Sequence, residues 1–187
     1  MDAVAQEIAD RLRSAPFVKI VTHIDTEGIP GGAIASEALA RAGIEHEVAF
    51  AKHLDEEGLT AIKREGRPLV WFVDLGAGVL HAMHGLDAVI TDHHVPTERE
   101  VPKALRSDLL RFTESLDRVL MLNPHLEGNG SDVASGAGCA YAVARALDAK
   151  NTDLAAVAIV GAVGDMQEAE FRRLDGYNRT VLADAEA

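Results

Sequence analysis

Five short apolar runs constrain this chain more than any other feature of its sequence, and each is too short for a typical helix. Longer segments separate them, in which apolar residues recur at helical spacing. Strands that are apolar on both faces are typical of parallel sheets, which helices cover on both sides. Alternating strands and helices therefore predict an α/β fold with a parallel five-stranded sheet. The predicted strands are 17–21, 47–50, 69–73, 88–91 and 118–122.

The segments between these runs carry helix signals. Val4, Ile8 and Leu12 share one face of an opening helix. Pro30 marks the start of a second helix, because proline suits a first helical turn. At 187 residues, the chain is expected to form one Rossmann-like domain over 1–187 with helices on both faces of the sheet. Further helices are expected at 55–64, 79–83, 136–149, 153–163 and from 177 onward, with a loop and one helix in 96–117.

The charge and composition exclude several classes of protein. The chain has 30 acidic and 18 basic residues, a formal net charge of −12, so it is poorly suited to binding nucleic acid without added cations. No apolar run approaches the roughly 18 residues that a membrane span needs, and the acidic N-terminus does not resemble a secretory signal. Cys139 is the only cysteine, which excludes an internal disulfide and is typical of a reducing cytoplasm.

Acidic residues and histidines follow the predicted strands and one apolar helix. Ligands of open parallel sheets bind beyond the carboxyl ends of the strands. Positions 23, 25 and 27 share parity, so an extended backbone would project all three to one side. Carboxylates and imidazoles without thiolates favour Mn²⁺ or Mg²⁺ over a structural zinc. The candidate site residues are His23, Asp25, Glu27, Asp74, Asp92, His93, His94 and Asp165.

Each of these residues also has an ordinary structural interpretation. Asp74 is compatible with a cap for the following helix. The adjacent His93 and His94 are compatible with solvated or core positions, and Asp165 with the start of a turn. The coincidence of all of them at one sheet edge is what favours a functional site.

Four short motifs occur in order along the chain: His23-x-Asp25-x-Glu27-Gly28, Val73-Asp74-Leu75-Gly76, Asp92-His93-His94 and Gly164-Asp165. They resemble motifs one to four of the DHH phosphoesterase superfamily, which includes RecJ-type single-strand exonucleases, oligoribonucleases and manganese pyrophosphatases. The stretches 122–125, 135–138 and 176–179 are most similar to the archaeal RecJ-like branch. The resemblance covers about residues 17–180.

The resemblance implies a site for two Mn²⁺ ions, with Mg²⁺ as an alternative, that activates water for attack on phosphorus. Asp92 would accept a hydrogen bond from His93, and His94 would contact the scissile phosphate. The implied ligands are His23 and Asp25 for one ion, Glu27, His93 and Asp165 for the other, and Asp74 as a bridge.

Two glycine-containing helix starts accompany these motifs, at 30–32 and 135–136. Their backbone N–H groups would suit phosphate oxygens, and their glycines would equally allow helix and sheet to pack closely. Both interpretations remain open from the sequence alone.

The chain departs from the family pattern in three ways. Glu27 and Gly31 stand where the family commonly has aspartate and serine. The longer Glu27 side chain predicts a loosely held second ion that Glu27→Asp would tighten. The DHH-associated second domain that closes over the site in most RecJ-like enzymes is expected to be absent from this chain.

The sequence therefore predicts a metal-dependent phosphodiesterase that converts single-stranded DNA or short oligonucleotides to 5′-mononucleotides, weakly when isolated. A second lobe or a protein partner such as GINS is expected to assist it. The alternatives are a non-catalytic replication module of the same fold, or a phosphatase acting on pyrophosphate or a cyclic dinucleotide. The retained acids favour an enzyme, whereas Glu27 and the acidic surface favour the module.

Overall fold

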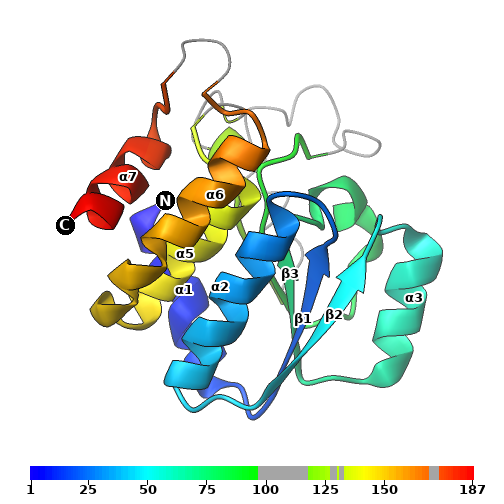
Figure 1. The fold of residues 1–187 in the computed structure, drawn as a ribbon. Helices are drawn as coiled ribbons and strands as arrows, with labels where there is room; N and C mark the ends of the chain where they lie inside the picture. Colours follow the sequence, from blue (N-terminus) through cyan, green and yellow to red (C-terminus); the bar gives the residue numbers. More distant parts are fainter. Residues whose placement is uncertain (97–117, 127–129, 131–132, 169–172) are drawn as a thin grey trace.

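A single parallel sheet forms the centre of the molecule (Figure 1). The computed structural model describes residues 1–96, 118–126, 130, 133–168 and 173–187. The strands lie in the order β2-β1-β3-β4-β5, and every neighbouring pair is parallel. This confirms the predicted five-stranded sheet. The strands are β1 (Val18–His23), β2 (His46–Ala51), β3 (Leu69–Val73), β4 (Ala88–Thr91) and β5 (Val119–Leu122).

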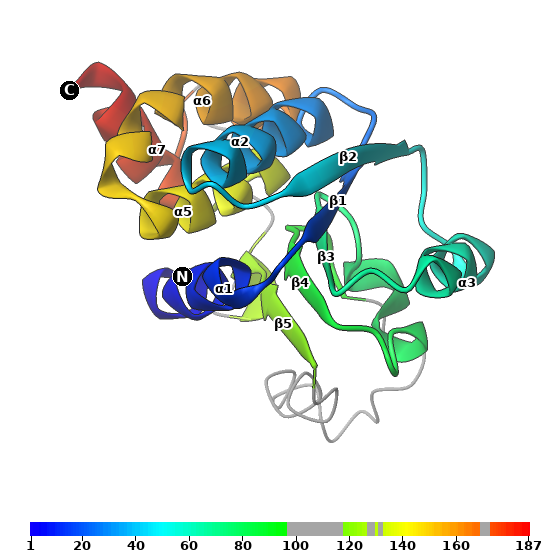
Figure 2. The ribbon, with the colours of Figure 1, turned by 90° about the horizontal axis from the view of Figure 1, so that it is seen from below.

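Helices cover both faces of this sheet, as Figure 2 shows from below. Helices α1, α2 and α5 pack on one face, with α6 and α7 outside them, while α3 and η1 cover the other face. The helices are α1 (Asp2–Ser14), α2 (Gly28–Arg41), α3 (Glu56–Glu65), α5 (Gly136–Leu147), α6 (Ala155–Gly164) and α7 (Tyr177–Glu186). Three short 3-10 helices are η1 (Ala77–Ala82), η3 (Pro124–Leu126) and η4 (Ala149–Leu154).

Strand β3 shows how the sheet separates two cores. Its residues alternate between faces, so Trp71 packs with α1, α2 and α5 whereas Phe72 packs with α3 and η1. Both side chains are fully buried. The indole N–H of Trp71 donates to the hydroxyl of Thr91 at 3.0 Å, which satisfies the polar atom of a buried aromatic ring.

Helix α5 lies between α1, α2 and α6 and is buried along most of its length. Its sequence Gly-Ala-Gly-Cys-Ala carries only small side chains, which lets neighbouring helices approach closely. Ser135 caps the helix by accepting the N–H of Gly138 at 3.1 Å. Cys139 is buried in this helix, as its apolar surroundings predicted.

The structure differs from the sequence-based expectations at the start of α2. This helix begins at Gly28, before the expected Pro30. The backbone at 24–27 turns instead of continuing the strand, so the parity argument for residues 23, 25 and 27 was wrong. The loop and helix expected within 96–117 fall almost entirely outside the described residues. Among the described helices, none has both the length and the apolar character for crossing a membrane.

Candidate metal centre

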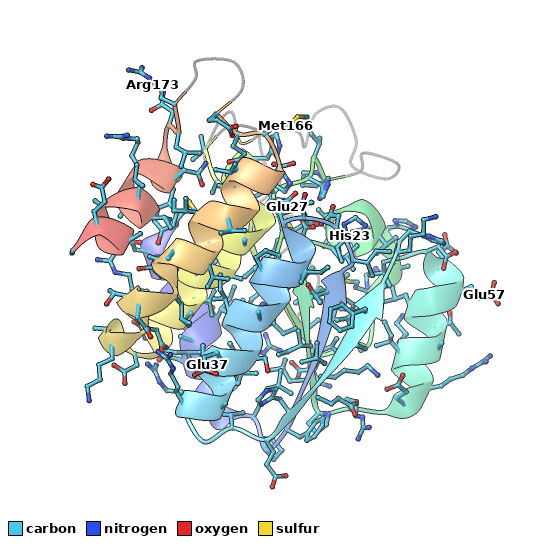
Figure 3. The ribbon with its side chains drawn as sticks, in the orientation of Figure 1. His23, Glu27, Glu37, Glu57, Met166 and Arg173 are labelled. Carbon is cyan, nitrogen blue, oxygen red and sulfur yellow. The ribbon has the colours of Figure 1, made fainter. Side chains whose placement is uncertain are left out.

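The residues singled out by the sequence lie at one edge of the sheet. His23 ends β1, and Asp74 and Asp92 directly follow β3 and β4. Because these adjacent strands are parallel, their carboxyl ends meet at this edge. Asp165 follows α6 and places Oδ2 3.7 Å from Nδ1 of His93. Figure 3 shows His23 and Glu27 at this end of β1 and α2.

Asp74 occupies the centre of this edge. Its side chain is 0% exposed, yet neither carboxylate oxygen accepts a hydrogen bond from a described residue. Its φ of 57° is left-handed, which aspartate tolerates better than most residues. A buried carboxylate that accepts no hydrogen bond is costly when ionised, and its neighbours here are histidine nitrogens at 3.3–3.8 Å and other acidic groups. Its surroundings are therefore those that a cation would stabilise.

Two groups of potential metal ligands share Asp74. The first cluster consists of His23, Asp25 and Asp74, and the second cluster of Glu27, Asp74, His93 and His94. In each cluster, one ligand atom from every residue lies within 4.8 Å of the others. Imidazoles and carboxylates suit divalent cations. Asp74 thus lies where a ligand bridging two ions would lie.

The other two members of the first cluster, His23 and Asp25, are each held by contacts with residues outside the cluster. Nε2 of His23 lies 2.8 Å from the carbonyl oxygen of Lys52, which can accept its proton and leave Nδ1 to bind a metal. This Nδ1 lies 2.6 Å from Oδ2 of Asp25 and 3.3 Å from Oδ2 of Asp74. Asp25 is anchored to the start of α2, because its Oδ1 accepts the N–H groups of Glu27 at 3.3 Å and Gly28 at 2.9 Å.

Glu27 connects the second cluster to the start of α5. Its Oε1 lies 2.9 Å from Nε2 of His93, while its Oε2 accepts the N–H of Gly136 at 2.8 Å. The helix N-terminus favours this negative charge. A Cβ at Gly136 would lie 2.4 Å from Oδ1 of Asp74, so glycine permits this close approach. The extra methylene of Glu27 therefore serves a contact that aspartate would not reach.

Asp92 holds His94 instead of His93, which corrects the expected pairing. Its Oδ1 lies 2.8 Å from Nδ1 of His94 and accepts the N–H of the same residue at 3.1 Å. Its Oδ2 accepts the N–H of Ala77 at 2.8 Å. The turn after β4 brings the first histidine of the pair toward Glu27 and leaves only the second beside Asp92. Both Asp92 oxygens are used, so Asp92 is not a metal ligand in this arrangement.

Asp165 approaches the other side of the His93 ring. Its Oδ2 accepts a hydrogen bond from Nε2 of Gln167 at 2.9 Å, and it is not among the residues that form the second cluster. Gln167 also lies 3.4 Å from Nδ1 of His93 through the same nitrogen. Sequence reasoning missed Gln167, although its position two residues after Asp165 was a signal that could have indicated it.

One N–H group at each of the two glycine-containing helix starts is already used by the protein. The N–H of Gly136 bonds to Glu27, and that of Gly31 bonds to the carbonyl of Glu27 at 2.9 Å. A Cβ at Gly31 would lie 2.7 Å from Val73. The structure therefore favours close packing over phosphate binding as the reason for these glycines.

Comparisons with known proteins agree with this geometry. The chain matches no protein-family model. The uncharacterized protein MJ0831 of Methanocaldococcus jannaschii is 30% identical over 175 residues, which are 90% of this chain and 37% of that protein. The exonuclease RecJ bound to manganese superposes with a TM-score of 0.71 at 21% identity, over 98% of this chain and 46% of RecJ.

Two further structures are similar. The DHH domain of PF0399, a member of a family of ribosomal proteins, gives a TM-score of 0.68 at 20% identity, over 98% of this chain and 47% of that one. CDC45 from Entamoeba histolytica gives a TM-score of 0.61 at 15% identity, over 99% of this chain and 36% of CDC45. The chain has a RecJ-like DHH-domain fold. It spans less than half the length of each relative named here.

The charged groups at this sheet edge compete for protons. Burial, together with the negative charges of Glu27 and Asp92, raises the pKa of Asp74 far above its ordinary value. Burial and the charge of Glu27 also raise the pKa of Asp165. The hydrogen bond to Asp92 raises the pKa of His94 to about 9. For His93, burial lowers the pKa but the contact with Glu27 outweighs it, so the net shift is upward.

These pKa shifts predict how the stability of the metal-free protein depends on pH. Each raised pKa means that the folded state binds protons more tightly than the unfolded state. For His94 the stabilisation is complete below the unfolded pKa of about 6.5 and is lost as the pH rises through about 9. We expect the free energy of unfolding, measured by urea denaturation with a chelator, to fall across this window.

Two controls accompany this pH prediction. His94→Gln should make the free energy of unfolding depend less steeply on pH. His53→Gln, at an exposed histidine outside both clusters, should leave this dependence unchanged. With saturating Mn²⁺ the slope should reverse, because ligands release protons when a metal binds. If the free energy of unfolding of the metal-free protein rises from neutral to alkaline pH, the pKa shifts are contradicted.

Glu27→Asp is expected to lower the stability of the protein and to weaken metal binding at the second cluster. Shortening the side chain withdraws the carboxylate by about 1.3 Å, which removes the hydrogen bond to Gly136 or the contact with His93. An unsatisfied buried N–H costs about 1–3 kcal/mol. Urea denaturation should show this loss, and calorimetry should show weaker binding of one of two Mn²⁺ ions.

Glu37→Asp provides the matched control, because Glu37 lies on the exposed face of α2 and its ion pair among the described residues is with Arg41. It should change the free energy of unfolding by at most about 0.5 kcal/mol. Tighter Mn²⁺ binding in Glu27→Asp would restore the expectation drawn from the family pattern.

Proposed function

We propose that this protein is a two-metal phosphodiesterase that hydrolyses single-stranded DNA or short oligonucleotides to 5′-mononucleotides. The observation that carries the proposal is the buried carboxylate of Asp74, which accepts no hydrogen bond from a described residue and belongs to both clusters of potential ligands. A structural aspartate would have hydrogen-bond partners. Mn²⁺ is the proposed ion, with Mg²⁺ as an alternative, since both suit carboxylate and imidazole ligands.

In this proposal, Asp74 would bind both ions, and His23 and Asp25 would complete the first site. Glu27, His93 and Asp165 would complete the second site. Gln167 donates to Oδ2 of Asp165, so Oδ1 is the oxygen that would be left for an ion. When bound, the ions supply a water of lowered pKa and positive charge beside the phosphate.

His94 would act on the substrate directly. Asp92 holds its Nδ1, so Nε2 is the atom that remains for a phosphate oxygen. Its side chain is 55% exposed, unlike the buried His93. In the metal-free protein the hydrogen bond to Asp92 raises the pKa of His94 to about 9, so Asp92 favours the protonated imidazole. A protonated Nε2 donates to a non-bridging oxygen as negative charge develops there.

The net charge of −12 bears on the substrate. Single-strand binding requires a basic groove along the backbone, and this chain is acidic. Two divalent ions would return four positive charges where the phosphate lies. A second lobe or a protein partner, such as a GINS-like complex, would supply the remaining contacts in the cytoplasm.

The similarity to CDC45 supports a second candidate, a non-catalytic module that binds a partner in a replication complex. Such a module has no need for a buried carboxylate that accepts no hydrogen bond. The two candidates differ in whether divalent ions bind and whether phosphodiester bonds are broken, so metal binding and digestion together separate them.

Asp74→Asn is expected to stabilise the metal-free protein and abolish its response to Mn²⁺. The substitution removes a buried carboxyl group that is crowded by other acidic groups, and asparagine tolerates the left-handed backbone of this position. In the wild type, Mn²⁺ at about 100 times Kd should add about 2.7 kcal/mol of stability. Thermal unfolding with a chelator and with Mn²⁺ measures both effects.

Asp92→Asn is the matched control, since Asp92 is also a buried aspartate that directly follows a strand. Both its oxygens accept hydrogen bonds, so the substitution should destabilise the protein by about 1.5–3 kcal/mol. Equal destabilisation by the two substitutions would show that Asp74 is structural. If Asp74→Asn still bound two Mn²⁺ ions as the wild type does, Asp74 would not be a ligand of either ion.

Digestion of a labelled single-stranded oligonucleotide tests the reaction itself. With Mn²⁺, the wild type should release 5′-mononucleotides slowly, and a second lobe or partner should accelerate it severalfold. His94→Gln should keep Mn²⁺ binding but lose about 10²–10³-fold in kcat, as for removal of one transition-state donor. Mn²⁺ binding without any hydrolysis, alone or with partners, would favour the non-catalytic module.

A further inference from the structure

Gln167 is a buried amide directly beyond the end of α6. The chain turns there through Met166, whose φ of 55° is unusual for a residue other than glycine. The N–H of Met166 donates to Val163, and that of Gln167 donates to Ala162, the two bonds of a Schellman turn. As a result Met166 is 70% exposed, whereas Gln167 is 7% exposed and faces the sheet edge. Figure 3 shows Met166 at this end of α6.

The amide of Gln167 contacts two proposed ligands of the second ion. Its Nε2 donates to Oδ2 of Asp165 at 2.9 Å and lies 3.4 Å from Nδ1 of His93. Nε2 of His93, on the opposite side of the ring, faces Glu27 and Asp74 at 2.9 and 3.8 Å. Gln167 thus touches His93 on the side of the ring away from Glu27 and Asp74, and it touches one of the two oxygens of Asp165.

Asn178 determines which way this amide points. It lies at the start of α7, is 1% exposed, and donates from Nδ2 to Oε1 of Gln167. Its own N–H bonds to the carbonyl of Val133 at 3.1 Å, which fixes the residue. Because Oε1 of Gln167 accepts this hydrogen bond from Asn178, Nε2 of Gln167 remains directed at Asp165 and His93. Through this pair of amides, α7 is connected to the second cluster and has no such connection to the described residues of the first cluster.

We infer that Gln167 is a positioning residue for the second ion. Through Asn178, the affinity of the protein for this ion then depends on the position of α7. The inference rests on the proposed function, since it concerns ligands of a proposed ion. An amide that holds one oxygen of Asp165 leaves the other for the metal and limits rotation of the His93 ring. Residues that orient metal ligands in this way typically contribute about 10–100-fold to metal affinity.

Gln167→Met tests the inference, because methionine keeps much of the shape but cannot hydrogen bond. Calorimetry with Mn²⁺ should show one ion binding about 10–100-fold more weakly, while the other binds as in the wild type. Electron paramagnetic resonance should show isolated Mn²⁺ where the wild type shows a coupled pair. Asn178→Leu should weaken the same ion in the same direction, through the loss of the bond that orients Gln167.

Gln6→Met is the matched control, since Gln6 bonds only to Asp10 on the exposed face of α1 among the contacts described for it. It should leave both Mn²⁺ affinities unchanged. Thermal unfolding with a chelator separates positioning from packing. If Gln167→Met lowers the melting temperature but leaves both affinities unchanged, or weakens both ions equally, the inference is wrong. If the wild type binds no Mn²⁺, the proposed function fails first and the inference fails with it.

Discussion

The buried carboxylate of Asp74 is the group on which the arrangement of the site depends. The protein positions it through the backbone, because its N–H bonds to the carbonyl of Thr91 in β4 at 2.8 Å and its left-handed φ turns the side chain toward α5. Gly136 lets α5 approach without a clash. Burying an ionised group without a partner opposes folding. Proteins retain such a cost mainly where function requires it.

The carboxylates around Asp74 differ in how many of their oxygens the protein already uses. Asp92 uses both oxygens, for Ala77 and His94. Asp25 and Asp165 each use one for a hydrogen bond, with the start of α2 and with Gln167, and keep the other for the site. Asp74 uses neither. This gradation separates residues that organise the protein from residues that can bind a cation, a distinction that residue type alone does not make.

The same electrostatics relate the two candidate functions. Without cations, the sheet edge gathers negative charge in a chain of net charge −12, and a phosphodiester would be repelled. In the proposed function, two divalent ions at the same edge would attract phosphate. Without ions, this edge would keep its shape but would lack the positive charge that a phosphodiester needs. Metal binding is therefore the property that separates the two proposed functions.

The sequence by itself determined the α/β class, the five strands and the residues that gather at the sheet edge. Apolar strands must be buried on both faces, and parallel strands bring their carboxyl ends together wherever they lie in the sheet. The sequence could not determine the strand order, or that 24–27 turns instead of extending. Nor could it show that Asp92 holds His94, that Glu27 reaches Gly136, or that Gln167 and Asn178 support the second cluster. Each of these contacts joins elements that are distant in sequence or depends on a turn of one residue, and only tertiary packing fixes such geometry.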